Sequence, residues 1–100
     1  MPAERQEIPK NEVAAFCRKH FIRRLSLFGS VLKGVASEES DMDFLVEFYP
    51  GHLPTLVELA AMERELSELV NRPVDMRTFN DLSRYFRDQV LAEAEVQYAD

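Results

Sequence analysis

This sequence has little cysteine, and it lacks long apolar runs and an apolar leader segment. Its 100 residues include one cysteine, Cys17, so no disulfide can form within the chain and a reducing compartment is expected. No stretch approaches the roughly 18 consecutive apolar residues that a membrane-spanning helix needs. The N-terminal segment MPAERQEIPKNE is polar and has no apolar core of the kind a secretory signal carries. We therefore expect a cytoplasmic protein that does not enter membranes.

Positive charge is also in short supply. Lys and Arg number 12 against 18 Asp and Glu, which gives a net charge of −6 at pH 7. Such a balance argues against a protein that coats nucleic-acid backbones and predicts no direct nucleic-acid partner. It does not exclude nucleotide binding, because a bound divalent cation reverses the sign of the local charge. A basic protein partner would suit this net charge.

The remaining composition, 46% apolar and 30% charged, is that of an ordinary globular protein. A chain of this length is expected to form a single domain over residues 1–100. Apolar periodicity and turn residues then predict alternating helices and strands. The predicted elements are a helix ending near His20, strands Ile22–Phe28 and Met42–Tyr49, a helix from Leu59 to Val70 closed by Asn71 and Pro73, a strand Val74–Phe79, and a last helix carrying Leu82, Phe86 and Val90. This order predicts an α/β (α+β) fold, with a small mixed sheet of about three strands flanked by helices.

The segment richest in chemistry joins Gly29-Ser30, through ten residues, to Asp41-Met42-Asp43. Asp41 and Asp43 stand two residues apart at the start of a predicted strand, so both carboxylates project from the same face. Oxygen ligands of this kind select hard cations such as Mg²⁺ or Mn²⁺, and paired cations clamp an in-line phosphoryl displacement. Without a cation the two carboxylates would repel each other. The pattern therefore predicts a metal site.

Three further residues and a third carboxylate complete the predicted site. Gly29 lets the backbone turn sharply and approach a ligand without a Cβ in the way. The Ser30 hydroxyl and nearby amides can hold triphosphate oxygens, and Lys33 can add a positive charge. If the strand Val74–Phe79 lies beside Met42–Tyr49, Asp75 reaches the face of the aspartate pair. There it would bind metal and accept a proton from an attacking hydroxyl.

The segment GSVLKGVASEESDMDFLVEF resembles the signature of the nucleotidyltransferase superfamily typified by DNA polymerase β. The likeness extends over nearly the whole chain and is greatest to the minimal nucleotidyltransferases, the MNT antitoxins of HEPN/MNT toxin–antitoxin pairs. Two departures stand out: many relatives have Arg in place of Lys33, and relatives commonly have Gly in place of Asn71. The first keeps the charge but weakens bidentate phosphate contact.

The resemblance implies a nucleotidyltransferase fold and a metal-dependent transfer of AMP from ATP to an acceptor hydroxyl. It implies Asp41, Asp43 and Asp75 as catalytic and metal-binding residues, with ATP as co-substrate. It also implies a HEPN-domain ribonuclease toxin as partner in a hetero-oligomer, with a tyrosine of the toxin as acceptor.

Two alternatives remain at this point. The first is an antitoxin that neutralises its toxin by binding alone, which would have no need of the three aspartates. The second is a small-molecule nucleotidyltransferase, against which the apparent lack of residues for an acceptor-binding domain argues. That same lack favours an acceptor hydroxyl on a bound partner protein.

Overall fold

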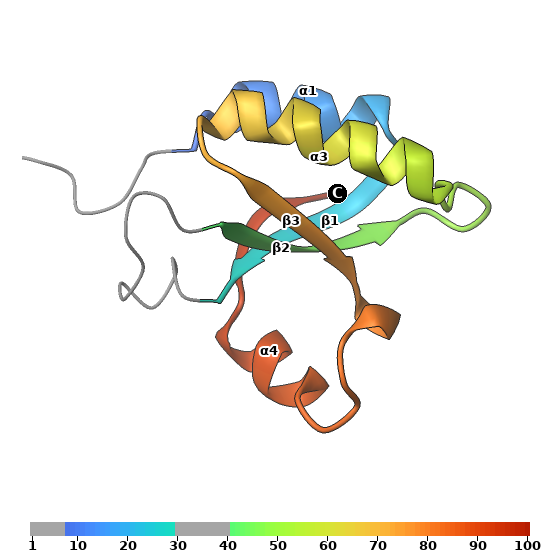
Figure 1. Cartoon of the computed structure of the whole chain (residues 1–100), viewed down its shortest axis with the longest axis vertical. Helices are drawn as coiled ribbons and strands as arrows, with labels where there is room; N and C mark the ends of the chain where they lie inside the picture. Colours follow the sequence, from blue (N-terminus) through green and yellow to red (C-terminus); the bar gives the residue numbers. More distant parts are fainter. Residues whose placement is uncertain (1–7, 30–40) are drawn as a thin grey trace, which may run out of the picture.

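The computed structural model describes residues 8–29 and 41–100, which form a sheet with helices on both of its sides (Figure 1). Its elements in chain order are α1 (Lys10–Lys19), β1 (Ile22–Phe28), β2 (Met42–Phe48), α3 (Leu56–Val70), β3 (Val74–Thr78), the 3₁₀ turn η1 (Phe79–Asp81), α4 (Arg87–Glu93) and β4 (Glu95–Ala99). The predicted α/β class is confirmed. The predicted single domain over residues 1–100 stays a prediction, because it includes residues outside those described.

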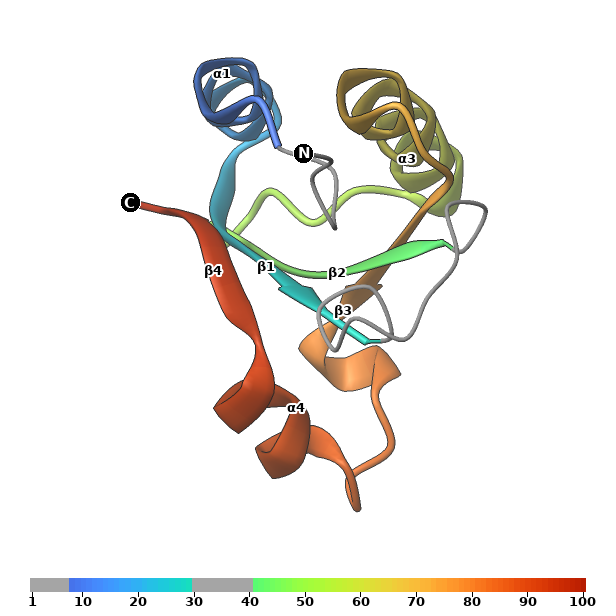
Figure 2. The same ribbon diagram turned by 90° about the vertical axis from the view of Figure 1, so that its left-hand side faces the viewer.

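The sheet is mixed, as predicted, with strand order β3-β2-β1-β4. β2 pairs in parallel with β3 and antiparallel with β1, and β1 pairs antiparallel with β4. α1 and α3 lie together over one face of the sheet, whereas α4 lies beyond the other face (Figure 2). The two faces therefore differ: one is covered by two helices, and the other is approached by the short helix α4.

The hydrophobic core lies between the sheet and the helices α1 and α3. Alternate residues of β2, namely Met42, Phe44 and Val46, are buried in it. Strand alternation sends the intervening Asp43 to the opposite face. The two helices contribute Val13, Phe16 and Cys17 from α1 and Met62, Leu66 and Val70 from α3. Burial raises the pKa of the Cys17 thiol to about 12, as expected for an unreactive core residue.

Local sequence explains both ends of α3. The Thr55 side chain accepts a hydrogen bond from the Glu58 amide at 3.1 Å, and the Glu58 carboxylate accepts one from the Thr55 amide at 2.8 Å. This reciprocal capping box satisfies two amides that the first turn leaves unpaired. At the other end Asn71 adopts the left-handed conformation, with φ 59° and ψ 38°. The predicted left-handed helix end at Asn71 is therefore confirmed.

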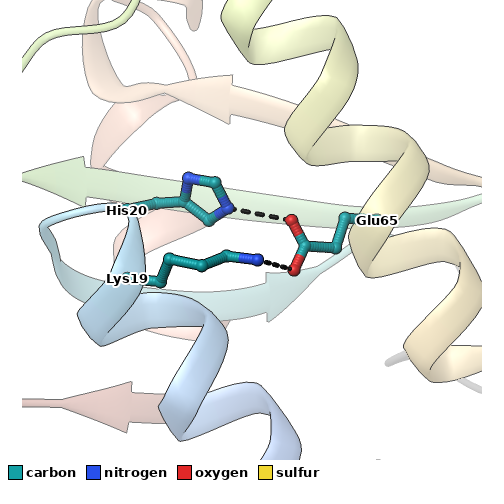
Figure 3. A network of polar contacts seen from close by, with 3 residues as sticks. All are labelled: Lys19, His20 and Glu65. Carbon is teal, nitrogen blue, oxygen red and sulfur yellow. Dashed lines mark hydrogen bonds and ion pairs between the residues drawn. The ribbon is translucent and has the colours of Figure 1, made fainter.

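A polar network joins the end of α1 to α3 (Figure 3). The Glu65 carboxylate forms an ion pair with Lys19 and accepts a hydrogen bond from His20 Nε2 at 2.9 Å. These contacts lower the pKa of Glu65, with the hydrogen bond from Lys19 as the largest cause.

Within the described residues, no helix is long and apolar enough to cross a membrane.

The C-terminal fifth of the chain corrects the sequence prediction. The predicted helix through Leu82, Phe86 and Val90 is wrong in extent, since η1 comes first and α4 begins only at Arg87. The Asp81 carboxylate accepts a hydrogen bond from the Thr78 amide at 3.0 Å and closes the short η1 turn. Residues 95–99 then form β4, a fourth strand that the prediction missed. Its pairing with the free edge of β1 is a long-range contact that no local pattern reveals.

Candidate active site

One row across the sheet brings together residues from three strands. Phe28 of β1 pairs with Asp43 of β2, and Asp43 pairs with Asp75 of β3. Residues directly opposite one another on neighbouring strands share a face, and the strands are about 4.8 Å apart. The next residues, Phe44 and Met76, are buried in the core beneath the helices. The row Phe28–Asp43–Asp75 therefore lies on the face opposite α1 and α3.

Asp41 lies immediately before β2 and is exposed. The Met42 amide donates to the Pro73 carbonyl oxygen at 2.8 Å, which ties the start of β2 to the start of β3. Asp41 thus stands where two strands begin side by side, two residues from Asp43. The placement of Asp75 beside the aspartate pair, which the sequence made conditional on neighbouring strands, is as predicted.

Gly29 follows β1 and packs directly against Asp43. Its φ is +90°, a backbone conformation that L-residues rarely adopt. A Cβ at this position would overlap the Asp43 carboxylate, with Oδ2 as the nearest atom. Glycine is therefore required here for two independent reasons: the turn that leaves β1, and the space that the carboxylate occupies.

The electrostatics of the row depend on Asp43. Burial raises the pKa of Asp43, and the negative charges of Asp75 and Asp41 raise it further, while Arg77 opposes them. A partly buried carboxylate beside two others is costly to ionise in the absence of a cation. A shifted acid of this kind is typical of functional sites.

Arg77 is a site residue that the sequence analysis missed. Its Nε donates to Asp75 Oδ2 at 3.0 Å, and the hydrogen bond to Asp75 is the main cause that raises the pKa of the guanidinium. Arg77 follows Asp75 by two positions in β3, so both side chains lie on one face. That spacing was visible in the predicted strand and would have found it.

The three carboxylates share one face, and carboxylate oxygens are the ligands that hard divalent cations prefer. Burial and repulsion between the carboxylates disfavour the ionised form of Asp43, and a bound cation would offset this cost. As the side chains lie, no three acidic, His or Cys side chains within residues 8–29 and 41–100 converge closely enough to hold an ion. Asp75 is engaged by Arg77, so it would exchange the guanidinium for a cation. Asp41, Asp43 and Asp75 are thus the residues that could hold a metal.

The other half of the predicted site is only partly described. Gly29 is placed as stated above. Ser30 and Lys33, predicted to hold triphosphate oxygens, lie outside the described residues. Their roles stay predictions.

Comparison with known proteins agrees with this arrangement. Residues 10–96 match the model of the nucleotidyltransferase domain family. The candidate protein adenylyltransferase MJ0435 of Methanocaldococcus jannaschii is 35% identical over 85 residues, which cover 85% of this chain and 89% of that protein. The protein adenylyltransferase MntA of Thermococcus cleftensis is 33% identical over 72 residues, covering 72% of this chain and 71% of the relative.

Solved structures give the same fold. A candidate minimal nucleotidyltransferase superposes with a TM-score of 0.70 at 38% identity, covering 85% of each chain. A complex of a tri-AMPylated Shewanella oneidensis HEPN toxin with its MNT antitoxin gives a TM-score of 0.65 at 16% identity, covering 91% of this chain and 70% of the other. The second likeness concerns the fold alone.

The predicted fold and enzyme class are confirmed by these matches, and both curated relatives are named for protein adenylyltransferase activity. With the family model matching residues 10–96, the chain belongs to the nucleotidyltransferase domain family.

Proposed function

We propose that this protein is a protein adenylyltransferase that transfers AMP from ATP to a hydroxyl group of a partner protein. The observation that carries the proposal is the pairing of Asp43 with Asp75 across parallel strands, with Asp41 two residues away and Gly29 against the Asp43 carboxylate. The names of the two curated relatives support the reaction class.

In the proposed reaction, the acceptor hydroxyl oxygen attacks the α-phosphorus of ATP. A bond forms between these two atoms, the bond from the α-phosphorus to the oxygen bridging the α and β positions breaks, and pyrophosphate leaves. Asp75 accepts the hydroxyl proton, because a tyrosine hydroxyl with an ordinary pKa of about 10 is a weak nucleophile at neutral pH. When bound, Mg²⁺ or Mn²⁺ supplies positive charge against the α-phosphate and the departing pyrophosphate.

The chain's own residues have distinct tasks in this scheme. Asp41 and Asp43 would hold the cation, and Asp75 would contribute to it at the side where the acceptor enters. Arg77 pairs with Asp75 until the cation displaces the guanidinium from the hydrogen bond at 3.0 Å. Gly29 leaves room for the triphosphate, which Ser30 and Lys33 would hold.

The acceptor that we propose is a tyrosine of a HEPN-type ribonuclease toxin, so that this protein acts as the antitoxin within a hetero-oligomer. The fold neighbour in complex with a tri-AMPylated HEPN toxin supports such a partner. The net charge of −6 favours association with a basic ribonuclease.

Co-expression with the candidate toxin, followed by intact-mass spectrometry of the toxin, tests this function. We expect a mass gain of one or more AMP units, lost with Asp43→Asn and retained with Asp88→Asn, an exposed carboxylate of α4 that serves as control. Asp75→Asn should reduce turnover more than ATP affinity. Neutralisation of the toxin by Asp43→Asn, with no mass gain in either case, would instead establish an antitoxin that acts by binding.

A further inference from the structure

Four large apolar side chains are exposed at the end of the sheet opposite to the carboxylate row. They are Phe21, before β1, Leu53, in the loop after β2, and Leu56 and Val57, in the first turn of α3. Their exposed fractions are 50%, 76%, 85% and 80%, respectively. The loop after β2 and the start of α3 lie together at the right of Figure 1, whereas β2 and β3 begin at its left. These four residues are called the distal patch, and none of them belongs to the candidate active site.

Phe21 holds its exposed ring at a cost in backbone energy. It follows the α1 cap residue His20 and has a φ of 59°, a left-handed conformation that is unusual for a bulky residue. Glycine is the usual residue at this position after a helix. The Phe21 ring stacks on His52, with ring centroids 4.0 Å apart and 12° between the planes. Strained residues of this kind gather at functional sites, which makes Phe21 a candidate contact residue.

Two grooves adjoin the distal patch. The first, of about 420 Å³, lies between the end of α1 and α3, and Phe21 is part of its wall. The second, of about 540 Å³, lies between the end of β2, the start of α3 and η1, and its wall includes Leu56 and Phe79. Leu53 and Pro54 line both grooves, so the two hollows are neighbours on either side of this loop. Grooves of this size can receive apolar side chains of a partner.

The charge around the distal patch is negative. Lys19 is the one Lys or Arg among the described residues that line the two grooves, and its charge is offset by the ion pair with Glu65. Glu58 lines the first groove and Asp81 the second. Both carboxylates accept hydrogen bonds from backbone amides, which leave the negative charge in place. A partner that has Lys or Arg beside its apolar side chains complements this surface.

We propose that the distal patch docks a basic amphipathic helix of the partner protein, an inference that rests on the proposed function. Apolar side chains along one face of such a helix would enter the two grooves, and flanking Lys or Arg would meet Glu58 and Asp81. The grooves surround a loop and the start of a helix rather than a free strand edge. A helix, which needs no backbone partners, therefore fits them better than an extended peptide.

Docking at the distal patch leaves the carboxylate row free. Asp43 and Phe48 lie five positions apart in β2, which corresponds to about 17 Å at about 3.3 Å per residue. A protein partner spans this distance, so one part of it docks while its acceptor hydroxyl enters at Asp75. The distal patch therefore contributes affinity for the partner and takes no part in the chemical step.

Calorimetry with the candidate toxin in the absence of ATP, and the kinetics of AMP transfer to it, test the inference. The double variant Leu56→Gln/Val57→Gln removes two apolar contacts and retains α3, because both side chains are exposed and glutamine favours helices. We expect toxin affinity to fall about tenfold or more. In transfer, KM for the toxin should rise while kcat stays unchanged. Val96→Gln in β4 is the control, since Val96 is 53% exposed and lies outside both grooves.

Glu58→Gln tests the charge of the surface without loss of the helix cap. Glutamine at this position of a capping box can still accept the hydrogen bond from the Thr55 amide. Toxin affinity should fall in this variant, and it should decrease less steeply with added NaCl than in the wild type. An unchanged dependence on NaCl would show that the partner brings no positive charge to Glu58.

Wild-type toxin affinity in the double variant would overturn the inference, while continued AMP transfer would leave the proposed function in place. A fall in kcat with unchanged KM would also overturn it, because the distal patch would then act on the reaction. So would self-association of the protein alone in sedimentation that the double variant loses, since a second copy would then cover the distal patch. If the wild type binds the toxin, the double variant does not, and the toxin gains no mass with ATP, the docking surface is supported and the proposed reaction is overturned.

Discussion

Replacing Gly29 by alanine tests the coupling between the turn after β1 and the carboxylate of Asp43. The added methyl group has two effects. It forces an L-residue to adopt a φ of +90°, and it overlaps the Asp43 carboxylate. The first effect costs roughly 1–2 kcal/mol, the penalty for an L-residue in the left-handed region. The second displaces Asp43 from its place in the row.

Gly51 provides a matched control, because it has nearly the same backbone strain without the contact. Its φ is +84°, and no heavy atom of the described chain lies within 4 Å of a Cβ built there. Gly51→Ala should therefore lose about 1–2 kcal/mol of unfolding free energy from strain alone. Gly29→Ala should lose more than this, and the excess measures the cost of moving Asp43.

Urea unfolding gives the two free energies, and titration calorimetry with Mn²⁺ reads the site directly. We expect Mn²⁺ affinity and AMP transfer to fall at least about tenfold in Gly29→Ala, equivalent to 1.4 kcal/mol, and to stay at wild-type level in Gly51→Ala. Wild-type Mn²⁺ affinity in Gly29→Ala would refute the reasoning, because Asp43 would then bind the cation without the space that Gly29 provides. An equal loss of binding in both variants would refute it too.

Three further perturbations address charges in the site and between the helices. Asp43→Asn should raise the melting temperature of the metal-free protein. Burial and the neighbouring carboxylates raise the pKa of Asp43, so its ionised form is unfavourable in the folded state. In a thermal melt, Mn²⁺ should stabilise the wild type but not this variant. Arg77→Gln should strengthen Mn²⁺ binding in calorimetry, since the guanidinium competes with the cation for Asp75; weaker binding would show that Arg77 supports the site. Glu65→Gln should cost about 0.5–1 kcal/mol in urea unfolding at neutral pH. The pKa of Glu65 is lowered in the folded state, so the ionised side chain stabilises the fold above the ordinary glutamate pKa. This stabilisation is lost as the pH falls through the folded-state pKa. The unfolding free energies of wild type and variant should therefore become equal in acid. A constant difference at every pH would contradict this assignment.

Local chemistry by itself determined much of this protein. The alternation in Met42–Phe48 sets Asp43 apart from the core, and the turn residues after Val70 end α3 at a left-handed Asn71. The spacing from Gly29-Ser30 to Asp41 and Asp43 predicted the chemistry of the site. These features depend on side-chain periodicity and backbone preference, and both are set by residues that are close together in the sequence.

Tertiary structure alone decided which of these pieces meet. Asp75 lies opposite Asp43 because β2 and β3 pair in parallel in one particular register, and Gly29 contacts Asp43 because β1 pairs on the other side. The C-terminal segment shows the same limit, since only Val90 of the three apolar residues that suggested a longer helix lies in α4, and residues 95–99 form a strand that completes the sheet beside β1. Pairing between strands distant in sequence depends on burial of the whole sheet face against α1 and α3, and no local window contains that information.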